Sequence, residues 1–233
     1  MSMLALATYL LIAQTPPPEG AATRLSLGIG SDFPEAAGAY VRSEVGPRLQ
    51  LGMSVGWMPA AYVDAINAVL TNFNVYGDTS ARLISATLSD SIAVRAQVGW
   101  RPFPSSGFYF AGGYSFLGLG GRLTGTELLT AVTGKAVDSP LLERVGVKAS
   151  TRVHQALLEL GWRFGLSRSF QWEVALGGFS TLSASSSFGL VNQPELAKDF
   201  RPLRAAAESW TNTRLERWIH GGTVSLRIYF RAF

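Results

Sequence analysis

The chain has 233 residues, of which 47% are hydrophobic and only 15% are charged, and its net charge is +4. This composition favours a folded protein over a disordered one, and cations spread along the chain without a basic, aromatic-containing cluster argue against a nucleic-acid partner. The absence of cysteine excludes disulfides and thiolate metal sites, and no segment approaches the roughly 18 apolar residues of a spanning helix. Membrane residence, if any, must therefore come from strands.

The N-terminus resembles an export signal. An apolar run from Met3 to Ala13 has the length of a signal-peptide core, and a polar, proline-rich stretch follows it up to Ala22. We expect residues 1–22 to be a signal peptide and linker, and residues 23–233 to form one domain. The alternative is a buried helix that the prolines after Thr15 would end at once.

Eight segments of the remaining chain alternate between apolar and polar residues. In Arg48–Trp57 and Ser91–Arg101, for example, every second residue is apolar, which predicts strands with one apolar face because successive side chains point to opposite faces. The expected strands are Arg24–Gly30, Gly38–Val45, Arg48–Trp57, Ser91–Arg101, Phe108–Leu119, Arg152–Phe164, Phe170–Ser183 and Gly221–Phe233.

The connections between these strands alternate in length. Short turns fall at Gly46–Pro47, 103–107 and 165–169, whereas the other connections are 31–37 and three insertions at 58–90, 120–151 and 184–220. Up-and-down connectivity places all short turns at one end, which is the asymmetry between periplasmic turns and extracellular loops in outer-membrane barrels. With an even number of strands, both termini lie at the short-turn end.

The long connections contain helical patterns. Apolar residues recur at helical spacing in Ala60–Phe73, a second helix is expected to begin at Thr79 or Ser80, and Thr124 and Glu127 have the spacing of a capping box. Further helices are expected after Ser139–Pro140 and at Pro194–Glu195, the latter interrupted at Pro202. These helices could pack as a cap over the barrel mouth, form a groove for a partner, or lie on the outer leaflet.

The two faces of the strands differ in chemistry. An eight-stranded barrel has room only for side chains inside, so a polar face turned inward predicts a hydrated or ion-paired interior, formed by Arg42, Glu44, Arg48, Arg95, Arg101, Glu159, Arg163, Gln171, Glu173 and Arg227. The apolar face carries aromatics near the barrel ends, as expected of a lipid-interface girdle: Trp57, Trp100, Phe108, Phe110, Trp162, Phe164, Phe170, Trp172 and Phe230.

With these features the chain resembles the small eight-stranded outer-membrane β-barrels of the OmpA and OmpX type, over Arg24–Phe233. The resemblance implies an all-β, antiparallel, up-and-down transmembrane barrel that is exported through the inner membrane to the outer membrane of a Gram-negative bacterium. It also implies contact with outer-membrane lipid and lipopolysaccharide, and recognition of the C-terminal Phe233 by the barrel-assembly machinery. Phe233 is one residue out of register with the apolar face ending at Phe230, which predicts a bulge or frayed end.

The sequence predicts no catalytic, metal or cofactor site. His154 and His220 are the chain's histidines, and Ser150 and Glu216 are the nearby groups with suitable chemistry, but no nucleophile-elbow motif or close His–Ser spacing accompanies them. We therefore expect a non-enzymatic barrel with a structural or surface-interaction role, whose extracellular partner the sequence does not identify. Two alternatives stay open: a barrel that binds or passes apolar molecules through a lateral opening, and a hydrolase or acyltransferase acting on lipid A or phospholipid.

Overall fold

The computed structural model describes residues 23–72, 91–135, 137, 139–167, 169–191, 197–218 and 220–231. Within them, eight antiparallel strands form a closed barrel in which each strand pairs with its neighbours in the chain and β8 pairs with β1. The expected eight-stranded, up-and-down barrel is therefore confirmed. Its strands are β1 (Arg24–Phe33), β2 (Ala36–Val45), β3 (Leu49–Trp57), β4 (Ile92–Trp100), β5 (Phe108–Thr124), β6 (Gly146–Gly165), β7 (Phe170–Leu190) and β8 (His220–Arg231).

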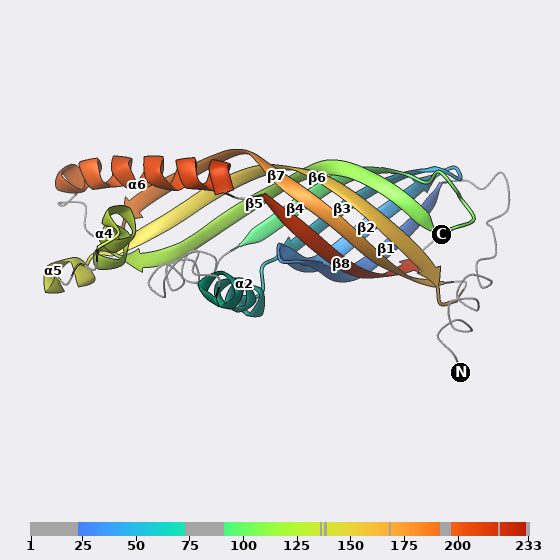
Figure 1. Ribbon diagram of the computed structural model, residues 1–233, viewed down its shortest axis with the longest axis horizontal. Coiled ribbons are helices and arrows are strands. Elements are labelled where there is room, and N and C mark those ends of the chain that lie inside the picture. The colour runs from blue at the N-terminus through green and yellow to red at the C-terminus, as the bar shows by residue number, and fades with distance from the viewer. Residues whose placement is uncertain are drawn as a thin grey trace.

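The two ends of the barrel differ as the connection lengths predict (Figure 1). The turns after β2, β4 and β6 are short and lie at the end where β1 begins and β8 ends. Gly46, in the turn after β2, has a φ of +67°, a backbone conformation that residues with a Cβ rarely adopt. No helix among the described residues is long and apolar enough to cross a membrane.

The first connection is shorter than expected. Residues 31–37 were predicted as a connection, but β1 continues to Phe33 and β2 begins at Ala36, which leaves a turn of Pro34 and Glu35. Asp32 and Glu35 are both buried. Their carboxylates bind interior arginines, so a polar segment that reads as a loop is part of the barrel wall.

Strands β5, β6 and β7 continue well beyond the barrel. The pairing of β4 with β5 stops at Gly118, and that of β7 with β8 stops at Ser180, yet the three strands stay paired with one another to Thr124, Gly146 and Leu190. We call this extension, with the helices that pack on it, the arm; Figure 1 shows it projecting from the barrel end opposite the short turns.

The apolar residues change face where the arm begins. On β6 in the barrel, Leu158, Leu160 and Trp162 point outward, whereas in the arm Val147 and Ala149 point inward and are buried. The outward residues of the arm are mostly serine, glycine and cations. The alternation of apolar and polar residues therefore continues into the arm, but there the apolar side chains point inward and the polar ones outward. This inversion explains why the three strands are longer than predicted, since the expected strand ends lie close to where the outward apolar residues stop.

Three helices cover the arm: α4 (Gly125–Thr133), α5 (Pro140–Glu143) and α6 (Ala197–Trp218). Helices α4 and α6 pack against the inward-phase side chains in a small core outside the barrel, composed of Leu123, Leu128, Val145, Val147, Ala149, Phe188 and Ala207. Because this core buries an apolar sheet face that water would otherwise contact, it holds the helices on the strands.

Helix α6 also protects the edge of β7 that β8 leaves unpaired. The Ser186 amide donates to Asn212 Oδ1 at 2.7 Å, and the Phe188 amide donates to Glu208 Oε1 at 3.2 Å. These side chains replace the carbonyls of a missing neighbouring strand, a solution to the exposed-edge problem of β-sheets. The predicted interruption at Pro202 is wrong, because α6 passes through it; the proline lies near the start of the described helix and deletes a single backbone donor.

Other helix predictions are confirmed where the structure describes them. Helix α2 (Ala60–Asn72) lies at the barrel mouth, where its Tyr62 packs edge-on against Phe33 with ring centroids 5.2 Å apart. The capping box of α4 is formed, with the Glu127 amide donating to Thr124 Oγ1 at 3.2 Å and the Thr124 amide donating to the Glu127 carboxylate at 2.7 Å. The starts expected at Thr79 or Ser80 and at Pro194 lie outside the described residues, as do residues 1–22.

The described helices are distributed between the arm and the barrel mouth. Helices α4 and α5 lie on the arm and α2 lies at the rim (Figure 1), while Leu215 of α6 packs on the apolar cluster at the mouth. That cluster consists of Ala36, Ala93, Leu117, Val153 and Ala184.

The packing of the arm predicts a contrast between neighbouring positions on β6. Ala149→Asp places a carboxylate without a cationic partner in the apolar core and should loosen α4 and α6, because an unpaired buried charge is strongly destabilising. Trypsin should then cut sooner after Arg204, while the barrel keeps its folded mobility in an unheated gel. Ser150→Asp, on the exposed face, is the matched control. Equal digestion rates for the two variants would contradict the packing described.

Candidate functional site

The barrel interior contains a connected set of buried charges, which we call the ion network. Its members share burial below 10% exposure and at least one ion pair to another member: Asp32, Glu35, Arg42, Glu44, Arg95, Glu159, Arg163, Glu173 and Arg227. They come from β1, β2, β4, β6, β7, β8 and the first turn, so charges distant in sequence meet at the barrel axis.

Arg227 of β8 lies at the centre of the ion network. Its guanidinium donates to Asp32 Oδ1 at 2.7 and 2.9 Å, to both oxygens of Glu159 at 2.5 and 2.8 Å, and to Glu173 Oε1 at 2.8 Å. One planar side chain therefore joins carboxylates of three other strands. Such charge-assisted, multidentate bonds are the strongest that arginine forms.

The network extends from Arg227 toward the mouth through Asp32. Asp32 Oδ2 accepts from Arg95 Nη1 at 2.6 Å and from the Tyr40 hydroxyl at 2.9 Å. Arg95 also donates to Glu35 in the first turn. This explains why Asp32 and Glu35 are held inside the barrel.

Toward the short-turn end the network extends through Glu173. Glu173 Oε2 accepts from Arg42 Nη1 at 2.8 Å and Arg163 Nε at 3.0 Å, and Arg163 Nη1 donates to Glu44 at 2.7 Å. Arg42 also donates to Gln171 at 2.6 Å. The chain of pairs thus runs along the barrel from Glu35 to Glu44.

Tyrosines fill the space between the charges. The Tyr109 hydroxyl donates to Glu159 at 2.6 Å, and the Arg42 guanidinium lies 4.0 Å from the centroid of the Tyr229 ring. Room for the Tyr109 ring exists because Gly161 faces it: a Cβ at Gly161 would lie 2.3 Å from the ring. Glycine on the barrel wall therefore serves the packing of aromatic rings against the ions.

The structure places most of the predicted interior residues in the ion network and separates three of them. Arg48 is exposed in the turn after β2, and Arg101 is half-buried and donates to the Pro104 carbonyl. Gln171 is half-buried and bound to Arg42. Sequence reasoning missed Asp32 because it was assigned to a connection, although it continues the inward series of Ser26, Gly28 and Gly30.

The interior leaves little empty space. Two cavities beside the ion network have volumes of about 10 and 20 Å³, each comparable to the space one water molecule requires. Their lining includes Arg227, Tyr229, Gln97 and Gly52. Neither cavity has room for a solute larger than water.

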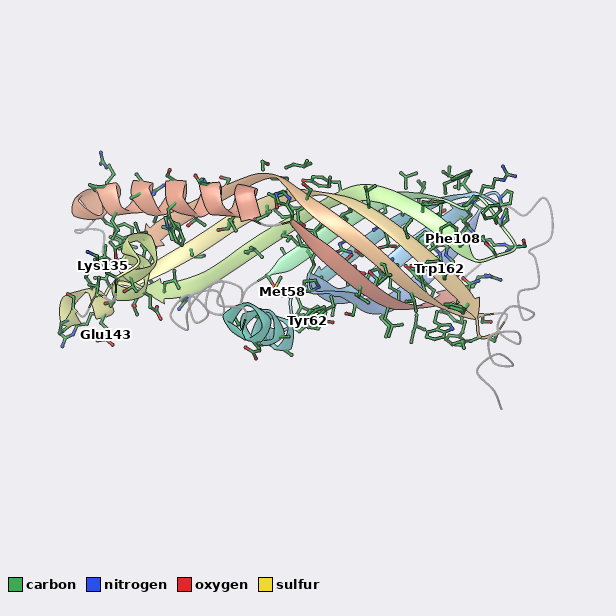
Figure 2. All side chains as sticks on the ribbon, in the orientation of Figure 1. Met58, Tyr62, Phe108, Lys135, Glu143 and Trp162 are labelled. Carbon is green, nitrogen blue, oxygen red and sulfur yellow. The ribbon has the colours of Figure 1, made fainter. Side chains whose placement is uncertain are left out.

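The outer face carries aromatic contacts at both ends. Near the short turns, the rings of Phe108 and Trp162 lie 5.1 Å apart and those of Phe164 and Trp172 lie 5.2 Å apart. Figure 2 shows Phe108 and Trp162 at that end, with Met58 and Tyr62 near the mouth and Lys135 and Glu143 at the far tip of the arm. Every predicted girdle residue is exposed or half-buried on the outer face: Trp57, Trp100, Phe108, Phe110, Trp162, Phe164, Phe170, Trp172 and Phe230.

Both histidines lie on the outer face near the mouth. His154 Nδ1 is hydrogen-bonded to the Tyr114 hydroxyl, and its ring lies 5.5 Å from that of Phe116. His220 Nδ1 lies 3.0 Å from Ser180 Oγ. Sequence spacing did not reveal this cross-strand pair, because Ser180 and His220 meet only through the pairing of β7 with β8.

The Ser180–His220 pair lacks a third group within the described part of the chain. A Ser–His nucleophile needs a residue that orients the imidazole, but no described residue bonds the second ring nitrogen of His220. Ser150 lies four residues from His154 along β6, and the Glu216 side chain and Phe233 lie outside the described residues. No group of three His, Asp or Glu side chains in the described ranges is arranged to hold a metal ion.

Comparisons with known proteins give distant structural matches. No protein-family model matches the chain, and no curated protein matches it. Acinetobacter baumannii CarO2 matches at a TM-score of 0.42 with 10% identity, covering 90% of this chain and 98% of that one. Acinetobacter baumannii CarO matches at 0.40 with 11% identity, covering 93% and 100%. At this level of similarity neither match indicates what this chain does.

The central position of Arg227 predicts a large effect on stability. Arg227→Met leaves three buried carboxylates without their common partner and should lower the free energy of unfolding by about 3–5 kcal/mol. Urea unfolding followed by tryptophan fluorescence would measure the change. Arg48→Met removes the same group at an exposed position and should cost about 0.5 kcal/mol or less. Adding Glu159→Gln to Arg227→Met should recover part of the loss; equal effects of the two single variants would show that the ion network does not support the fold.

Proposed function

We propose that this chain is an outer-membrane protein of a Gram-negative bacterium, a closed barrel that anchors the arm at the cell surface in a structural or surface-interaction role. The observation that carries the proposal is the inversion of polarity between the two parts of the molecule. The barrel is ionic inside and apolar outside, whereas the arm is apolar inside and polar outside.

The outer face of the barrel supports a lipid environment. Large apolar side chains are exposed on every strand, with Ile29, Leu158 and Met53 at 70%, 75% and 61%. A contiguous apolar belt of this kind is very unfavourable in water and is what a bilayer requires. The buried ion network has the opposite arrangement from a soluble barrel, whose core is apolar.

The height of the apolar belt is suitable for a membrane. On β6 the outward apolar residues run from Phe164 to Ala156, about 26 Å along the strand at about 3.3 Å per residue. A strand tilt of about 35–45° reduces this to about 20 Å along the barrel axis, near the apolar band height of about 25 Å in outer-membrane barrels. The belt ends where His154 and Arg152 begin.

The packed interior favours an anchor over a passage. A barrel that binds or transports apolar molecules needs an apolar cavity, whereas the two cavities beside the ion network are small and lined largely by polar side chains. The arm, by contrast, has its own core and carries helices away from the barrel, as a surface for recognition would.

The topology can be tested directly because the chain has no cysteine. In a Gram-negative host, Lys135→Cys at the arm tip should react with a membrane-impermeant maleimide on intact cells. Ser105→Cys, in the short turn after β4, should react only after the outer membrane is permeabilised. Both positions are exposed, so accessibility in the folded protein is matched. Labelling of Ser105→Cys alone on intact cells would invert the proposed orientation.

The assignment of the two faces can be tested on β4. Val94 points outward in the middle of the strand, so Val94→Arg should reduce folding into lipid vesicles, with a cost on the order of 2–4 kcal/mol at mid-bilayer. Gln97 points inward beside both water-sized cavities, and an arginine there can extend toward the carboxylates of Asp32, Glu159 and Glu173 that line them. Folding yield, read from mobility in unheated gels, should therefore be higher for Gln97→Arg. The reverse order would mean that the apolar face is not the lipid face.

A further inference from the structure

The outer face of the arm carries three cations on two paired strands, which we call the cationic strip: Arg122, Lys148 and Arg152. Arg122 of β5 lies directly opposite Lys148 of β6, and Arg152 follows four residues along β6, about 13 Å away at about 3.3 Å per residue. All three side chains are exposed. The register therefore gathers three positive charges on one face of the sheet.

No carboxylate in the described part of the chain pairs with the cationic strip. Arg122, Lys148 and Arg152 form no ion pair, hydrogen bond or ring contact with any described residue. Arg122 and Lys148 occupy opposite positions on adjacent strands, about 5 Å apart at Cβ, where like charges are destabilising. An anion bound between them would remove this repulsion.

The neighbours of the cationic strip leave it open. On β7 the residues opposite Lys148, Ser150 and Arg152 are Gly189, Ser187 and Ser185. A Cβ added at Gly189 would meet no atom within 4 Å, so the space beside Lys148 is free among the described atoms. Hydroxyl groups and small side chains around three cations can donate hydrogen bonds to anionic oxygens without crowding them.

The cationic strip begins where the lipid-facing belt ends. Proceeding along β6, the outward residues are Leu158, Ala156, His154 and then Arg152, and His154 binds Tyr114, an aromatic of the interfacial type. The position places the strip at the height of lipid headgroups on the outer side, above aromatic side chains of the kind found at membrane interfaces. A ligand at this height is reached by lateral diffusion in the membrane.

We propose that the cationic strip binds the phosphate groups of outer-leaflet lipids, specifically of phosphorylated glycolipid such as lipid A. The proposal rests on the membrane orientation given under Proposed function and assigns a lipid ligand to the arm. Arg122 and Lys148 clamp one phosphate between paired strands, and Arg152 contacts the headgroup nearer the apolar belt. Phosphate fits because arginine and lysine bind it through charge-assisted hydrogen bonds.

The test uses the full barrel folded in detergent micelles and dansyl-labelled lipid A, with energy transfer from tryptophan as the binding signal. A triple variant, Arg122→Gln, Lys148→Gln and Arg152→Gln, should bind lipid A about tenfold more weakly or worse, because it loses the charge-assisted contacts. The matched control, Arg48→Gln, Lys135→Gln and Arg201→Gln, lowers the net charge equally at exposed positions outside the strip and should bind like the wild type. Arg122→Lys with Arg152→Lys keeps the charges and should retain most of the binding.

Each outcome distinguishes the proposal from its alternatives. Equal weakening in both triple variants would show attraction by net charge alone, and unchanged binding in the strip variant would place the lipid elsewhere; either result overturns the proposal. Displacement of lipid A by inorganic phosphate at the same phosphate concentration would show a phosphate site without lipid specificity and would overturn the lipid assignment. Failure of the wild type to insert into phosphatidylcholine vesicles would instead count against the membrane orientation itself, since that step requires no phosphate recognition by the strip.

Discussion

The pairing of Arg227 with Asp32, Glu159 and Glu173 is the constraint on which the barrel depends. A closed sheet of eight strands is too narrow for a water-filled lumen, so every polar side chain that points inward must be satisfied by another side chain or by an isolated water. One guanidinium that reaches carboxylates on β1, β6 and β7 meets this requirement across the closure of the barrel, because β8 is the strand that pairs with β1. Pairing of the interior charges and closure of the barrel therefore depend on the same side chain, Arg227.

The ion network also explains where the barrel ends. Beyond Glu35 and Arg95 the inward residues become small and apolar, forming the cluster of Ala36, Ala93 and Val153 at the mouth. From there the same inward phase continues into the arm, where it packs under α4 and α6. A strand that passes from lipid into water must change the side on which its apolar residues lie. In β5, β6 and β7 this change occurs while the three strands stay paired with one another. In the proposed orientation, the polarity inversion marks the boundary between lipid and water.

Alternation within strands made the barrel predictable, because a period of two places ten or more residues on known faces without reference to any contact. It did not reveal Asp32, whose role depends on Arg227 nearly two hundred residues away in the sequence, or the pair of Ser180 with His220, which depends on register. The arm strands were underestimated because their outward face is serine-rich and reads as loop. The helix through Pro202 was mispredicted because packing on the arm, through Phe200 and Leu203, outweighs the loss of one donor.

Arginine serves opposite purposes in the two halves of this molecule. Inside the barrel, four buried arginines face five buried carboxylates, and each guanidinium forms at least one ion pair with them. On the arm, Arg122 and Arg152 stand with Lys148 on a face where the described strands place no carboxylate. Two cations at opposite positions on adjacent strands destabilise the sheet, and a serine at either position would remove this repulsion. A charge cluster at the proposed lipid boundary, without a carboxylate partner among the described residues, is therefore better explained by a ligand than by stability.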